Sequence, residues 1–204
     1  DVAGVKAYWA DSTGNLGIKD FDVQRRIWNV AGQNGVDYRG VLLQHLEDED
    51  KFMGNFNFVK PVSHSIRQNE GAELASVMRH VRLARDANFR GVFYVCHASS
   101  PDSIEFLNSE KGKVPYEIVI ETTGHHEQLN VNDYERFGNL VKVNPPLRSV
   151  ESQKRVLEHV IEGRTDIIGD DHAPHPFERK VSDDPPSGFA TSAFLPKRVE
   201  LLEG

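Results

Sequence analysis

The sequence contains a single cysteine, Cys96, among 204 residues, so it can form neither a disulfide framework nor a metal site of several thiolates. No run approaches the ~20 apolar residues of a membrane-spanning helix, and no apolar leader follows a basic start. Basic residues are also in deficit, and the formal charge of −7 disfavours nucleic acid and anionic membrane surfaces as partners. These absences predict a soluble protein of a reducing cytoplasm.

What is present is an alternation of short β-rich runs with helical segments. The expected strands are residues 2–8, 40–45, 91–97, 117–122, 140–143 and 166–169, and the expected helices are residues 20–32, 70–88, 102–107 and 150–162. This order predicts an α/β fold with a parallel sheet, and a barrel and a doubly wound sheet both fit it. No linker divides the chain, so residues 1–204 are expected to form one domain or part of one.

Histidines stand where two of the β-rich runs end, namely His45 and His97. In a parallel α/β barrel the carboxyl ends of the strands form the active-site rim, and imidazoles from different strands can converge there on one metal ion. Either residue alone is explained equally well as a hydrogen-bonded histidine at a strand end. Two of the same kind favour the metal site.

Residues 167–175, Ile-Ile-Gly-Asp-Asp-His-Ala-Pro-His, place two carboxylates and two imidazoles directly after another expected strand. A carboxylate there can ligate a metal and accept a proton from water, and a histidine four positions later can bind an anionic substrate. The competing interpretation is a solvated acidic turn.

Lys6 lies in an apolar run, where an ammonium is costly unless it is paired or carboxylated. Asn144 precedes two prolines that fix the turn presenting its amide.

Other polar residues are expected to have structural roles. His64, His80 and His159 lie in loop or helical contexts with polar neighbours, which predicts surface positions. Glu47 and Asp48 follow His45 and are expected to orient it or to cap the next turn, not to ligate a metal.

In order and spacing these segments resemble the cyclic amidohydrolases of the amidohydrolase superfamily, and among them the dihydroorotases most closely. The matching motifs are Val-Lys-Ala-Tyr at 5–8, His-Leu-Glu-Asp at 45–48, His-Ala-Ser-Ser at 97–100, Glu-Thr-Thr-Gly-His-His at 121–126, Lys-Val-Asn-Pro-Pro-Leu-Arg at 142–148 and Asp-His-Ala-Pro-His at 171–175. The last two motifs favour dihydroorotase over hydantoinases and allantoinases, which usually differ there.

The resemblance implies a (β/α)8 TIM-type barrel of the metal-dependent hydrolase kind, of which this chain represents about strands 4 to 8. It implies two zinc ions, with Lys6 as the carboxylated lysine that bridges them and His45 and His97 as ligands of the second zinc. Asp171 is then a ligand of the first zinc and also the catalytic base and acid. Asn144 and His175 are the implied substrate contacts. The implied reaction is the reversible ring opening of dihydroorotate to carbamoyl aspartate in pyrimidine biosynthesis.

The chain also departs from the family pattern. The family's first strand carries His-x-His, which occurs nowhere in this sequence, and strands 1 to 3 have no counterpart. A five-stranded barrel has open edges and is not expected to be stable as a monomer, so we expect upstream material and a homo-oligomer. The alternatives are a noncatalytic scaffold or partner of aspartate carbamoyltransferase, a module that holds one zinc ion without turnover, and a hydantoinase-like or allantoinase-like enzyme.

Overall fold

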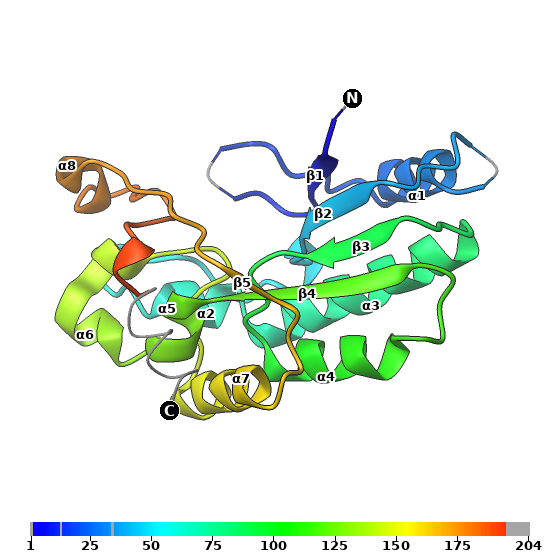
Figure 1. Cartoon of the computed structure of the whole chain (residues 1–204). Coiled ribbons are helices and arrows are strands. Elements are labelled where there is room, and N and C mark those ends of the chain that lie inside the picture. The colour runs from blue at the N-terminus through cyan, green and yellow to red at the C-terminus, as the bar shows by residue number, and fades with distance from the viewer. Residues whose placement is uncertain (1, 13, 34, 195–204) are drawn as a thin grey trace.

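The computed structural model describes residues 2–12, 14–33 and 35–194. Its centre is a five-stranded sheet in the order β1-β2-β3-β4-β5, in which every neighbouring pair is parallel (Figure 1). The strands are β1 (Gly4–Tyr8), β2 (Val41–His45), β3 (Val92–Val95), β4 (Glu117–Thr123) and β5 (Ile167–Gly169). Each strand pairs with the next one in sequence, which is the order of a barrel wall and not of a doubly wound sheet.

All described helices except the last, which follows β5, connect successive strands. The long ones pack on one another in chain order, α1 on α3, α3 on α4 and α4 on α7. They are α1 (Phe21–Ala31), α2 (Ser63–Arg67), α3 (Glu70–Asp86), α4 (Pro101–Glu110), α5 (Gly124–Gln128), α6 (Asp133–Phe137), α7 (Val150–Ile161) and α8 (Phe177–Lys180), with 3₁₀ turns η1 (Glu49–Lys51), η2 (Gly138–Val141) and η3 (Ser192–Phe194). The four helices expected from the sequence are confirmed. Asn69 and Ser100 begin two of them by accepting hydrogen bonds from backbone N–H groups of the first turn.

The main core lies between the sheet and these helices. Trp28 of α1 is fully buried, stacks on Phe93 of β3 with ring centroids 5.6 Å apart, and donates from its indole Nε1 to His80 Nδ1 of α3 at 2.9 Å. The predicted surface position of His80 is therefore wrong, because the indole supplies the partner that a buried imidazole needs.

The opposite face of the sheet carries Lys6, Leu43, Tyr94 and Val119 in one row across four strands. Leu43, Tyr94 and Val119 are half-buried and Lys6 is exposed. The apolar run around Lys6 therefore does not bury its ammonium in the described part of the chain, because β1 is an edge strand whose side chains have neighbours on one side only.

One expected strand is absent from the described part of the chain. Residues 140–143 belong partly to η2 and do not join the sheet, so β4 pairs directly with β5. Gly138 begins η2 with a left-handed backbone (φ +57), and Pro145 and Pro146 offer no N–H to a neighbouring strand. The apolar run at 140–143 is buried by loop packing, since Val141, Val143 and Leu147 form a small second core with Tyr134. Within the described ranges no helix is long and apolar enough to cross a bilayer.

Candidate active site

The carboxyl ends of the strands surround a cavity of about 240 Å³. Its walls include all of the residues singled out from the sequence, namely Lys6, His45, His97, Asn144, Asp171 and His175. They come from β1, from the end of β2 and from the segments that follow β3, η2 and β5. The parallel sheet brings them together because all its strands present the same end to one edge.

The two strand-end histidines face one another across the sheet. His45 Nδ1 lies 3.2 Å from His97 Nε2, and His45 Nε2 lies 3.0 Å from a carboxylate oxygen of Glu47. All three side chains are buried. Glu47 therefore orients His45 as expected, and two ring nitrogens held this close must share either a proton or a metal ion.

The backbone at His97 is held by Glu121, to which the sequence analysis assigned no role. Glu121 accepts a hydrogen bond from the His97 backbone N–H at 2.9 Å and another from the Tyr94 hydroxyl at 2.6 Å. His97 has a left-handed backbone (φ +38), a strained conformation for a residue with a Cβ atom. Gly169 of β5 lies against the Glu121 carboxyl group, where a Cβ atom would clash. Only the three-dimensional pairing of β4 with β5 reveals this support.

Asp171 has a left-handed backbone as well (φ +47), a conformation that aspartate tolerates better than most residues. Partial burial of its carboxyl group, together with the nearby carboxylates of Glu121 and Asp170, raises the pKa of Asp171. Lys6 and His45 oppose this rise through their positive charge. A raised pKa makes a carboxylate a better proton acceptor, which suits a general base.

Asn144 is positioned by a histidine that the sequence analysis had placed at the surface. His64 is buried, and its Nε2 lies 2.9 Å from the Val143 carbonyl oxygen and 2.8 Å from Asn144 Oδ1. Both partners are acceptors, so Nε2 carries the proton and donates, which leaves the Asn144 Nδ2 amide for the cavity. The expectation for His64 is wrong because its partners lie about 80 residues away in sequence.

His175 is tied to the loop after α8. Its Nε2 lies 2.9 Å from the Ser187 carbonyl oxygen, so this nitrogen donates a hydrogen bond and Nδ1 is the ring nitrogen left for a ligand. Lys180 fixes the same loop, because its ammonium donates to the carbonyl oxygens of Lys142, Pro186 and Gly188 at 2.8–2.9 Å.

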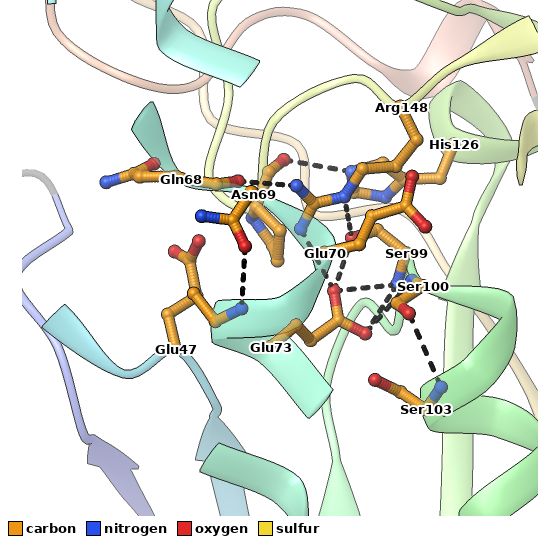
Figure 2. Close-up of polar contacts among 12 residues, drawn as sticks. Glu47, Gln68, Asn69, Glu70, Glu73, Ser99, Ser100, Ser103, His126 and Arg148 are labelled. Carbon is orange, nitrogen blue, oxygen red and sulfur yellow. Dashed lines mark hydrogen bonds and ion pairs between the residues drawn. The ribbon is translucent and has the colours of Figure 1, made fainter. Parts of the chain in front are cut away.

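A buried polar network supports the loops behind the cavity (Figure 2). The Arg148 guanidinium donates to Ser99 Oγ at 2.9 Å and to a Glu73 carboxylate oxygen at 3.2 Å. Glu73, near the start of α3, also accepts from the Ser99 hydroxyl and from the backbone N–H of Ser100 at 3.0 Å. His126 Nε2 lies 2.9 Å from the Pro145 carbonyl oxygen. The network joins the segment after β3, which carries His97, to the segment that carries Asn144.

Buried neutral histidines make the fold sensitive to acid. Burial lowers the pKa of His64 to about 3 and that of His126 to about 4, from an ordinary value of 6.5, and it lowers the pKa of His80 well below 6.5. Between pH 6.5 and about 4 the unfolded chain binds more protons than the folded chain, so stability falls as the pH falls. At about pH 4.5 the loss is on the order of 2.5 kcal/mol each for His64 and His126.

We therefore expect the free energy of unfolding, measured with urea, to drop steeply between about pH 6.5 and 4.5. In His64→Gln the slope against pH is expected to flatten, because one proton-binding difference between the two states is removed. A slope that is the same in the variant and in the parent protein would contradict this account.

The donor set fits a metal ion that the family implies. Two tetrahedral ligand atoms at the usual Zn–N distance lie roughly 3.3 Å apart, close to the 3.2 Å between His45 Nδ1 and His97 Nε2. Asp171 and Lys6 line the same cavity, and carboxylation would give Lys6 an anionic oxygen donor. Among the described residues, no three His, Cys, Asp or Glu side chains form a metal-holding group by themselves.

Comparisons with known proteins agree with this geometry. The curated dihydroorotase of Halobacterium salinarum is 29% identical over 186 residues, which is 90% of this chain and 41% of that protein. The dihydroorotase of Staphylococcus epidermidis is 31% identical over 159 residues, 74% of this chain and 36% of that protein. No protein-family model matches.

Among solved structures, an L-hydantoinase from Arthrobacter aurescens has a TM-score of 0.75 at 23% identity and covers 92% of this chain and 42% of its own. The dihydroorotase of Saccharomyces cerevisiae, crystallised with 5-fluoroorotic acid, has a TM-score of 0.73 at 21% identity. The match covers 99% of this chain and 55% of the yeast chain. These likenesses establish the fold, and the five parallel strands are part of a TIM-type barrel.

The chain belongs to the cyclic amidohydrolases of the amidohydrolase superfamily. Within that class its curated relatives are dihydroorotases, as the motifs from residue 142 onward had indicated. The chain spans about two fifths of the length of each of the first three dihydroorotases that it matches.

Proposed function

We propose that this protein acts as a zinc-dependent cyclic amide hydrolase that opens dihydroorotate reversibly to carbamoyl aspartate, a step of pyrimidine biosynthesis. The observation that carries the proposal is the convergence on one cavity of two imidazoles at tetrahedral ligand spacing, a carboxylate and a lysine. The dihydroorotase relatives supply the choice of ring. The single cysteine supports a cytoplasmic location.

His45 and His97 would hold the second of two zinc ions, Asp171 would be a ligand of the first, and carboxylated Lys6 would be a ligand of both. When bound, zinc would act as a Lewis acid: it would polarise a ring carbonyl and lower the pKa of water, so that hydroxide is available as the nucleophile near neutral pH. Glu47 and Glu121 keep the two imidazoles in place, the first at the His45 ring and the second at the His97 backbone.

Proton transfer falls to Asp171, whose pKa is raised by burial. Its carboxylate takes the proton of the attacking water and returns it to the ring nitrogen as the amide bond breaks. Asn144 presents its Nδ2 amide to the ring because His64 occupies Oδ1. His175 contacts the ring carboxylate through Nδ1 while Nε2 remains on Ser187.

The test is zinc content and dihydroorotate turnover of the purified protein, compared with His45→Ala and His97→Ala. Each alanine variant is expected to lose the zinc that this pair holds, together with ring opening. His172→Ala is the matched control, since His172 is exposed and, among the described residues, accepts hydrogen bonds only from the backbone N–H groups of Thr191 and Ser192. Unchanged zinc content in the His45 and His97 variants would refute the proposal.

The same experiment separates the alternatives. One zinc ion per chain without turnover favours a noncatalytic zinc-binding module. Faster hydrolysis of hydantoin or allantoin than of dihydroorotate favours those relatives. Homo-oligomer formation and association with aspartate carbamoyltransferase are further proposals, and sizing by light scattering with and without that enzyme tests both.

A further inference from the structure

A second cavity, of about 520 Å³, adjoins the candidate active site. The two cavities share Ser12, Asn144 and Ser187 in their walls, so Asn144 stands at the junction between them. The motifs that matched the family give no role to this second cavity.

Three cationic side chains line the second cavity, Arg67 at the end of α2, Lys142 after η2 and Arg179 in α8. Among the described residues no ion pair joins Arg67, Lys142 or Arg179 to a carboxylate. This gathering of positive charge stands out in a chain whose formal charge is −7.

Two carboxylates line the same cavity, and they leave an excess of positive charge. Asp11 shares the Lys19 ammonium with Glu49, so its charge is offset only in part. Asp184 lies in the loop near Lys142, and its charge opposes the lowering of the lysine pKa that burial and Arg67 cause. Three cations therefore face Asp184 and the partly offset Asp11, so positive charge is in excess.

Two of the three cations, Arg67 and Lys142, are also held in place. The Arg67 guanidinium lies 4.7 Å from the centre of the Phe52 ring, and the Lys142 ammonium lies 4.9 Å from that of Phe56. Lys142 Nζ donates to the Pro185 carbonyl oxygen at 2.7 Å. Burial lowers the pKa of Lys142 to about 8, so the ammonium keeps most of its charge near neutral pH. Preorganised cations around a partly enclosed space are what binding of an anion requires.

We propose that the second cavity is a binding site for an anionic group, a carboxylate or a phosphate, held by Arg67, Lys142 and Arg179. The anion has two possible sources. It is either the ring carboxylate, which this site would then hold in place of His175 and which rests on the proposed function, or a free anion that binds beside the ring.

The experiment is calorimetric titration of the whole chain with inorganic phosphate, in the parent protein and in the double variant Arg67→Gln/Arg179→Gln. We expect phosphate to bind the parent, and the double variant to bind it about tenfold or more weakly, since each charge-assisted hydrogen bond lost is worth about that factor. Arg90→Gln is the matched control, because Arg90 is exposed and lies outside this cavity. Arg67→Lys keeps the charge and is expected to retain most of the affinity.

Titrations with dihydroorotate and with uncharged dihydrouracil identify the source of the anion. A loss in the double variant that is confined to dihydroorotate assigns the site to a substituent of the ring. If the double variant binds both rings as tightly as the parent protein and only its phosphate binding is weaker, the site is assigned to a free anion. The proposal is overturned if the parent does not bind phosphate, or if the double variant binds it as the Arg90 control does. Phosphate binding in a protein that hydrolyses no cyclic amide would leave this site standing and refute the proposed function alone.

Discussion

Replacing Asp171 by asparagine is expected to lower the turnover number for ring opening by about 10²–10⁴-fold, the usual contribution of a positioned general base. The asparagine is nearly isosteric but cannot accept the proton of water or return it to the leaving nitrogen. Zinc held by His45 and His97 should largely remain, because both imidazoles and the Glu47 and Glu121 contacts that hold them are untouched.

The matched control is Asp170→Asn, one residue earlier in the same segment. Both variants remove one negative charge from the same rim, so a field effect would lower turnover in both, whereas loss of the base lowers it in the Asp171 variant alone. Metal content and the turnover number are measured on the same samples. Turnover close to that of the parent protein in Asp171→Asn would rule out this residue as the base.

Removing the Glu73 carboxylate is expected to destabilise the fold by about 3–5 kcal/mol, a large share of the stability of an ordinary domain. Glu73→Ala leaves the Arg148 guanidinium buried without its counterion and leaves the N–H groups of Ser99 and Ser100 without their acceptor. The loss is large because both partners are almost fully buried, so water cannot replace the carboxylate.

Urea unfolding measures the effect, with Glu105→Ala as the control. Glu105 pairs with Arg155 at 2.6 Å, but both side chains are partly exposed, so that change should cost no more than about 1 kcal/mol. The double variant Glu73→Met/Arg148→Met removes both buried charges and should recover part of the loss. If Glu73→Ala and Glu105→Ala lower the free energy of unfolding by similar amounts, the buried Glu73–Arg148 pair contributes no more to stability than the exposed Glu105–Arg155 pair.

The features that local sequence controls were predictable. The alternation of β-rich runs with segments of helical spacing predicted the parallel α/β fold and the helix positions. Strand-end positions placed His45 and His97 at one rim, because parallel strands all present their carboxyl ends to the same edge.

The features that depend on distant partners were not predictable. His64 is buried because two acceptors about 80 residues away surround its Nε2, and His80 because an indole 52 residues away donates to it. Lys6 is exposed because its strand is at a sheet edge, which the apolar run around it does not reveal. The strand expected at 140–143 carries the right side chains, but the glycine before it and the prolines after it prevent pairing.

The contact between Gly169 and the Glu121 carboxyl group has a consequence for how this sequence can diverge. A descendant that gained even a methyl group at position 169 would have to turn away or shorten the side chain at 121, and the His97 backbone would then lose its anchor. Growth at position 169 is therefore constrained by the side chain at position 121, whereas shortening the side chain at 121 creates no clash with Gly169.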